Sequence, residues 1–207
     1  MMNRLVRIFA CAAPLFAIGC VSVLPEAAPP KPRFHIEAAN TEALSGAPLN
    51  WSLVIDDPRA TRVYDTVRIA VAPAPGRIEY LGGAEWADRA PRLFQTALTQ
   101  TFEDAGRIIS VGDRLALPVA DIVLQTDIRR MELDVSNGKN AVVEVYARLT
   151  DGKGTVYAAR KFEGRGNAGS TNPNAVYDGF EAAFGEILTS IVEWSYAEGV
   201  AARGATG

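Results

Sequence analysis

Histidine and cysteine are scarce in this sequence, which has one histidine and two cysteines among 207 residues. Structural zinc sites use four cysteine or histidine ligands, and a catalytic dyad needs a nucleophile beside a base. A basic surplus is also missing, because 21 lysines and arginines stand against 24 aspartates and glutamates, a formal charge of -3. Nucleic-acid binding depends on a basic footprint that releases phosphate counterions. We therefore expect no metal, no cofactor and no nucleic-acid partner.

A hydrophobic run long enough to cross a bilayer is missing from the N-terminus as well. The uncharged stretch Ile8–Ile18 has eleven residues, whereas a membrane-spanning helix needs about 20. It follows two arginines and leads to a small residue, which is the pattern of a signal peptide. Ala17-Ile18-Gly19-Cys20 resembles a bacterial lipobox. The resemblance implies cleavage of residues 1–19 and a covalent N-acyl and S-diacylglycerol lipid on Cys20.

The residues after Cys20 bear on location and reach. Two or three acyl chains hold a protein on a membrane effectively permanently. In lipoproteins of the enterobacterial type an aspartate after the cysteine retains the protein at the inner membrane, and here that residue is Val21. By that resemblance we expect the periplasmic side of the outer membrane, with inner-membrane retention less favoured. Residues 20–32 contain four prolines and predict an extended tether about 35 to 40 Å long.

Apolar periodicity predicts one domain over residues 33–199 and a flexible tail over 200–207. Alternation and turn residues predict strands over 34–38, 49–55, 66–72, 78–81, 108–111, 120–135, 141–150 and 155–162. Apolar residues spaced by three and four predict a helix from Arg89 to Ala105, with Asp88 as N-cap and Gly106 as C-cap, and a second helix from Pro173.

Turn signals complete the fold prediction. Asn137-Gly138 and Asp151-Gly152 favour tight hairpins, whereas Pro73 and Pro75 should end the third strand and Gly164–Thr171 should form a loop. This order of elements predicts an α+β fold, in which two helices pack on one face of a mixed, mostly antiparallel sheet. The other face and any free edge strand then need charge, bulges or a partner.

Three side chains, those of Trp86, Trp194 and Tyr196, allow two interpretations each. Trp86 either fills the core, which we favour, or presents its ring to a partner. Trp194 and Tyr196 near the end of the second helix are similar, and one of them is expected to be exposed. His35 lies in a predicted strand and, as the lone histidine, is expected to have a structural or surface role.

Three segments carry a resemblance to a known family. They are Asp56-Asp57-Pro58-Arg59-Ala60, the run Tyr64–Val71 and the run Tyr80–Leu93, and the closing helix adds Ile191-Val192-Glu193-Trp194. Together they resemble the ABC-type transport auxiliary lipoproteins, a PqiC-like family, over roughly Phe34 to Ala197. The resemblance implies a non-catalytic component that accompanies an MCE-domain protein, an ABC permease and an ATPase. Such systems move phospholipid or other hydrophobic molecules across the Gram-negative envelope.

The implied role is a docking module that Cys20 anchors to the membrane, with homo-oligomers possible. Candidate partner contacts are Arg59, Arg62, Tyr64, Tyr80 and Trp86. Two other classes stay open. A scaffold lipoprotein of the envelope would have the same sequence features, and a periplasmic hydrolase would need a nucleophile with His35 as its base.

Overall fold

The computed structural model describes residues 30–204, and the chain from Lys31 onward forms one compact unit. Residues 1–29 and 205–207, which include the predicted signal peptide, Cys20 and most of the predicted tether, lie outside the described residues. The elements, in chain order, are β1 (Arg33–Phe34), η1 (Glu42–Leu44), β2 (Leu49–Ile55), β3 (Arg59–Ala60), β4 (Arg68–Ala74), β5 (Arg77–Trp86), α1 (Ala90–Ala105), β6 (Ile108–Gly112), β7 (Ile122–Asp134), β8 (Asn140–Thr150), β9 (Val156–Asn167) and α2 (Pro173–Gly204).

Strand β7 is the centre of a nine-stranded sheet. On one side it forms an antiparallel meander with β8 and β9, whose two ladders are the longest in the sheet. The β7–β8 turn contains Gly138, whose φ of 92° is the positive value that the Asn-Gly signal predicts. In the β8–β9 turn the positive φ of 97° belongs to Gly154 and not to Gly152. Both predicted hairpins are thus confirmed. In the second, the glycine with positive φ lies two residues after the predicted Gly152.

On its other side β7 holds three strands placed one after another. Strands β2, β3 and β4 each pair with β7 in parallel, at Leu53–Ile122, Arg59–Asp127 and Ala70–Glu132. Strand β6 then pairs with β2, while β5 and β1 follow beyond β4. Five of the eight strand pairings are parallel, but the three antiparallel ladders contain most of the paired residues. By that measure the sheet is mixed and mostly antiparallel, as the sequence predicts.

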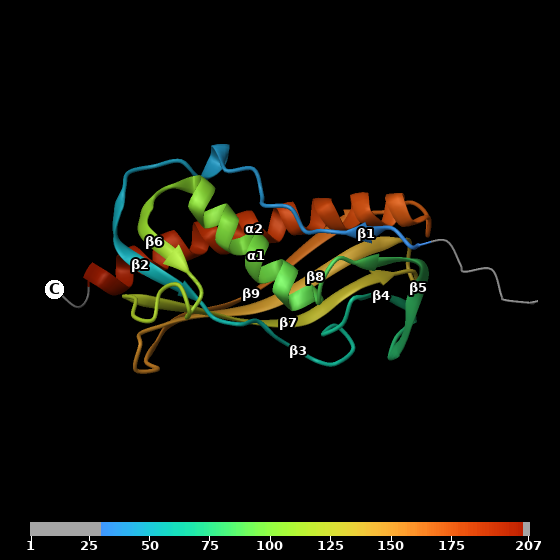
Figure 1. The fold of residues 1–207 in the computed structure, drawn as a ribbon, viewed down its shortest axis with the longest axis horizontal. Helices are drawn as coiled ribbons and strands as arrows, with labels where there is room; N and C mark the ends of the chain where they lie inside the picture. The colour runs from blue at the N-terminus through green and yellow to red at the C-terminus, as the bar shows by residue number, and fades with distance from the viewer. Residues whose placement is uncertain (1–29, 205–207) are drawn as a thin grey trace, which may run out of the picture. The chain divides into compact units, whose positions relative to one another are not determined.

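Both helices lie on the same side of the sheet, which Figure 1 shows with α1 and α2 above β7, β8 and β9. Their apolar stripes pack into one core with the inward residues of the strands, such as Leu124, Val143 and Val145. Outward residues of β8, among them Glu144, Tyr146 and Arg148, are half-buried on the opposite face. No helix of the described chain covers this open face. The α+β fold with two helices on one face is confirmed.

Glycines let α2 approach β9 closely. A Cβ atom on Gly164 would lie 2.1 Å from the carbonyl oxygen of Ala183, and one on Gly166 would lie 1.9 Å from that of Gly179. No side chain fits at either position. This contact explains why β9 continues to Asn167, whereas the sequence predicts a loop from Gly164.

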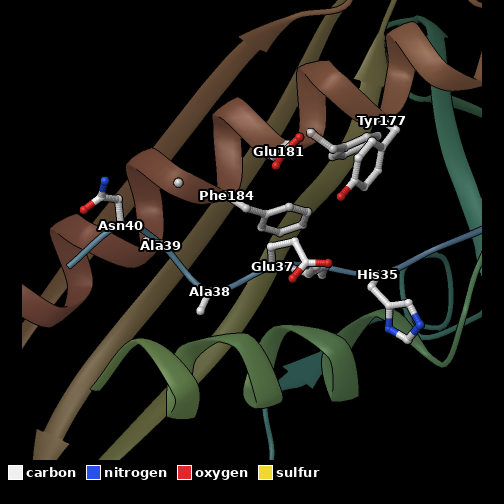
Figure 2. A pocket seen from close by; sticks show the side chains of 11 residues that line it. His35, Glu37, Ala38, Ala39, Asn40, Tyr177, Glu181 and Phe184 are labelled. Atoms are coloured by element: carbon white, nitrogen blue, oxygen red, sulfur yellow. The ribbon is translucent and has the colours of Figure 1, made fainter. Parts of the chain in front are cut away.

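The predicted first strand is much shorter than expected. Only Arg33 and Phe34 pair with β5, and residues 35–40 run as extended chain beside α1 and α2 (Figure 2). The amide of Ala39 donates to the hydroxyl of Thr101 in α1, at 3.1 Å. The alternation of large and polar side chains over residues 34–38 therefore reflects packing against the helices. Beyond Phe34 this segment does not pair with the sheet.

Pro73 and the Gly82-Gly83 pair do not end strands. Pro73 lies past the last pair between β4 and β7 and inside an irregularity of the β4–β5 ladder, so its missing N–H costs no ladder hydrogen bond. The two glycines lie in β5 where the ladder shifts register between Arg68–Glu85 and Ala70–Tyr80. The predictions of strand ends at these residues were wrong because both sites are bulges.

Helix ends also differ in detail. Gly106 caps α1 in the left-handed conformation as predicted, with a φ of 62°. The N-cap is Arg89 and not Asp88, whose carboxylate instead accepts the Arg89 amide at 2.6 Å. Helix α2 extends to Gly204, so the expected tail from residue 200 was wrong for residues 200–204. Gly199 and Ala202 in this last part of the helix are buried, which keeps it folded.

Candidate functional site

Four of the five predicted partner contacts lie on or beside one loop, residues 61–67, which we call the 61–67 loop. It joins β3 to β4 on the open side of the sheet and touches the start of α1 (Figure 1). Arg59 lies in β3 just before the loop, and Arg62 and Tyr64 belong to the loop. Tyr80 of β5 contacts the loop through its hydroxyl group. The structure thus brings Tyr80 into the same region as Arg59, Arg62 and Tyr64, which are close together in the sequence.

Tyr64 fastens the loop to β7. Its hydroxyl donates to the carboxylate of Glu132 at 2.5 Å, and Glu132 also accepts two hydrogen bonds from Arg130, at 2.8 and 2.9 Å. The Glu132 side chain is only 6% exposed, so its charge needs these partners. Burial and the hydrogen bond to Glu132 raise the pKa of the Tyr64 hydroxyl well above its ordinary value. Tyr64 therefore stays a neutral donor and is tied inward.

Two further contacts fix the loop. The Tyr80 hydroxyl donates to the carbonyl of Val63 at 3.4 Å, and the guanidinium of Arg68 lies 3.7 Å from the centre of the Tyr80 ring. Asp65 accepts two hydrogen bonds from Arg89 at the start of α1, one of them at 2.8 Å. The tyrosines thus hold the loop in place, which is a positioning role.

Arg59 and Arg62 are left as exposed cations. Neither side chain forms a hydrogen bond or an ion pair within the described chain, in contrast to those of Arg89 and Arg130. A rigid loop that carries unpaired charge is a suitable contact surface, because little conformational entropy is lost on binding. These two arginines are the predicted contacts that remain available.

Trp86 is not available to a partner. It is 2% exposed, and its ring meets Phe180 and Phe184 of α2 edge to face, at centroid distances of 5.1 and 6.2 Å. The prediction of Trp86 as a contact was wrong, and the alternative of core packing is confirmed. Trp194 and Tyr196 are both buried as well, so the expectation that one of them is exposed was also wrong.

A second region, which the sequence did not reveal, is a hollow of about 160 Å³ on the helix side. The extended segment 35–40 forms one wall and the first half of α2 forms the other (Figure 2). We call it the helix-side pocket. Its polar lining includes Glu37, Glu181 and Tyr177, and its apolar floor is Phe180 and Phe184. Tyr177 and Glu181 share a helix face by their spacing, but nothing in the sequence places Glu37 opposite them.

The charge in the helix-side pocket is negative. Burial and the nearby carboxylates of Glu181, Glu37 and Asp178 raise the pKa of the Tyr177 hydroxyl. Figure 2 shows this hydroxyl pointing from α2 toward the segment that carries Glu37. The region therefore disfavours any further negative charge.

His35 lies at the edge of the same pocket and is exposed. The described lining contains no serine, threonine or cysteine that could serve as a nucleophile beside it. Within residues 30–204 no three histidine, cysteine, aspartate or glutamate side chains gather as a metal site would require. The geometry around His35 gives no support to the hydrolase alternative.

Comparison with known proteins identifies the family. Residues 34–192 match the ABC-type transport auxiliary lipoprotein component. The chain belongs to this family. It is a family of transport auxiliary lipoproteins, which indicates a membrane-associated protein of the cell envelope.

Two solved structures resemble this family member. The chain is similar to the crystal structure of protein XCC0632 from Xanthomonas campestris, with 28% identity and a TM-score of 0.73 over 83% of this chain and 97% of that one. A crystal structure of an uncharacterized protein, 8% identical, shares the fold with a TM-score of 0.62 over 79% of this chain and 97% of its own.

One curated relative is an uncharacterized protein of Bradyrhizobium diazoefficiens, 31% identical over 150 residues. The match covers 71% of this chain but only 40% of that relative. Among the described helices of the family member none is long and apolar enough to cross a membrane.

Proposed function

We propose that this auxiliary lipoprotein is a non-catalytic docking component of an MCE-type ABC transport system that moves phospholipid or other hydrophobic molecules across the envelope. The observation that carries the proposal is the family match over residues 34–192. Its partners in this proposal are an MCE-domain protein, a permease and an ATPase. Diacylglycerol and an N-acyl chain on Cys20 anchor it to the periplasmic side of the outer membrane.

The 61–67 loop supplies the proposed contact surface. Its backbone is held by Tyr64, Asp65 and Tyr80, so Arg59 and Arg62 are presented from a fixed frame. Exposed arginines favour a partner surface rich in carboxylates, because planar guanidinium groups bind carboxylates through paired hydrogen bonds. Such rim charges accelerate association and set specificity more than they add affinity.

The test is purification of the tagged, membrane-extracted protein, with its neighbours identified by mass spectrometry. We expect an MCE-domain protein with its permease and ATPase, recovered less well with Cys20→Ala and several-fold less well with Arg62→Glu. Lys153→Glu is the matched control, since Lys153 is an exposed cation in the β8–β9 turn without an ion pair in the described chain. Equal losses with Lys153→Glu would exclude a specific role of the loop.

A scaffold role in the envelope is the alternative. Recovery of structural envelope proteins alone, without any permease or ATPase, would support the scaffold and contradict the transport proposal. The hydrolase alternative is tested separately with His35→Ala, because it needs His35 as its base. On the transport proposal this substitution should leave the transport phenotype of the strain unchanged.

A further inference from the structure

The helix-side pocket is built to be rigid. The ring of Tyr177 stacks on Phe34 with a centroid distance of 4.7 Å and an interplanar angle of 23°. Beneath it, Phe180 and Phe184 stack on each other at 6.0 Å and meet the buried Trp86. The aromatic wall of the pocket is therefore an extension of the core and does not need to form when a ligand arrives.

No residue that lines the helix-side pocket neutralises the charge of its two carboxylates. Neither Glu37 nor Glu181 forms a hydrogen bond or an ion pair with any other described residue, and none of the residues that line the pocket is lysine or arginine. Other carboxylates of the described chain do have such partners, as Asp56 has in Arg114 and Glu132 has in Arg130. A cation in this pocket would be attracted by both carboxylates, which are themselves exposed to solvent.

The lining favours an organic cation over a metal ion. Calcium takes six to eight oxygen ligands, and the described residues hold no group of three acidic or histidine side chains that could supply them. Aromatic faces together with carboxylates suit alkylammonium groups, whose charge is spread over carbon-bound hydrogens. A volume near 160 Å³ corresponds to about five water molecules, which is the size of a trimethylammonium or ethanolammonium group.

We propose that the helix-side pocket binds the ammonium group of an organic amine, with Glu37 and Glu181 compensating its charge and the half-buried ring of Tyr177 contacting its alkyl groups. The amine can belong to a phospholipid headgroup or be a soluble metabolite. This site lies on the helix side of the sheet, whereas the 61–67 loop lies on the open side (Figure 1). The inference therefore goes beyond the proposed docking function and can fail independently of it.

The test is isothermal titration of the full-length acylated protein, extracted in non-ionic detergent, with choline and with ethanolamine. The neutral isostere 3,3-dimethyl-1-butanol reports on shape without charge, and sodium chloride of equal concentration controls for screening. We expect choline or ethanolamine to bind at least about tenfold more tightly than the neutral isostere. Glu37→Gln and Glu181→Gln should each weaken binding about tenfold, a loss of about 1.4 kcal/mol.

Glu193→Gln is the matched control, because Glu193 is an exposed carboxylate of the same helix outside the pocket. It should leave binding unchanged. A second arm compares choline with glycerophosphocholine. Tighter binding of the glycerophospho compound identifies a lipid headgroup as the source, and tighter binding of free choline identifies a soluble amine.

Three results would overturn the proposal. They are equal binding of the neutral isostere, equal loss with Glu193→Gln, and failure of both amines when an arginine-containing peptide binds. The last outcome would assign the pocket to a basic side chain of a partner protein. Circular dichroism of Glu37→Gln and Glu181→Gln separates lost binding from lost folding, since both side chains are exposed and isosteric with their replacements.

Discussion

Tyr196 shows how a single buried hydroxyl makes the protein sensitive to alkali. Its ring lies between Phe102 and the guanidinium of Arg107, at 5.5 and 4.6 Å, and its hydroxyl has no hydrogen-bond partner in the described chain. Burial raises the pKa of Tyr196 to about 12. The unfolded chain, with a pKa near 10 for tyrosine, loses this proton first as the pH rises.

The sign of the effect follows. Because the pKa of Tyr196 is higher in the folded than in the unfolded protein, Tyr196 contributes to the free energy of unfolding in full below about pH 10. This contribution is lost between about pH 10 and 12. Over that window the free energy of unfolding should fall by about 2 to 3 kcal/mol through Tyr196 alone. In urea titrations at several pH values, Tyr196→Phe should show a shallower fall and little change at pH 7, whereas Tyr157→Phe controls for the loss of an exposed hydroxyl. Parallel curves for wild type and Tyr196→Phe would contradict the assignment.

The candidate sites were predictable only where a residue's own neighbours in the sequence decide its environment. Arg59 and Arg62 stand in a polar turn region, and their exposure follows from that. The sequence left two environments open for Trp86, and the buried one is decided by Phe180 and Phe184 of α2, from a distant part of the chain. Glu37 and Glu181 meet for the same reason, since tertiary packing places the extended segment against α2.

At the scale of elements, the contact between β9 and α2 depends on the absence of side chains. Gly166→Ala would place a methyl group 1.9 Å from a backbone oxygen, which can be relieved only if the helix moves away from the strand. We expect a loss of at least about 3 kcal/mol in the free energy of unfolding, measured by urea denaturation.

Gly185→Ala in the same helix is the control for Gly166→Ala. A Cβ there meets nothing within 4 Å, so the higher helix propensity of alanine should stabilise the protein by about 0.5 to 1 kcal/mol. If Gly166→Ala unfolded at the wild-type midpoint, the close approach of β9 and α2 would not exist in solution.

The helices and the meander could be predicted because their signals are local. Three- and four-residue spacing is strong in α1 and α2, and glycine turns bound the β7–β8–β9 run. The β4–β5 region could not, because proline and glycine end strands by local preference but are accommodated here by bulges that neighbouring strands impose. The single pair of residues in β1 was beyond prediction for a related reason, since the helices and not the sheet take up residues 35–40.

For the whole molecule, stability should not depend on the lipid anchor or the segment next to it. Every helix and strand of the described core lies within residues 33–204, and Lys31 and Pro32 add only contacts to Glu85. A chain that begins at Lys31 should therefore unfold in urea within about 1 kcal/mol of the acylated protein in detergent. A larger loss would mean that the preceding residues contribute to the fold.

The end-to-end placement of β2, β3 and β4 along β7 has a consequence for the order of events during biogenesis. The β7 partner of Leu53 is Ile122 and that of Ala70 is Glu132, both more than 60 residues later in the chain, whereas β7 and β8 each pair with the strand that follows directly. Closing such long loops is entropically slower than closing hairpins. A chain that emerges N-terminus first thus exposes its first half before the strand that organises it has arrived. During that interval the apolar strands β2 and β4 lack their β7 partner and must be kept from aggregating. They can pair with β7 only after that strand of the β7–β8–β9 meander has been made.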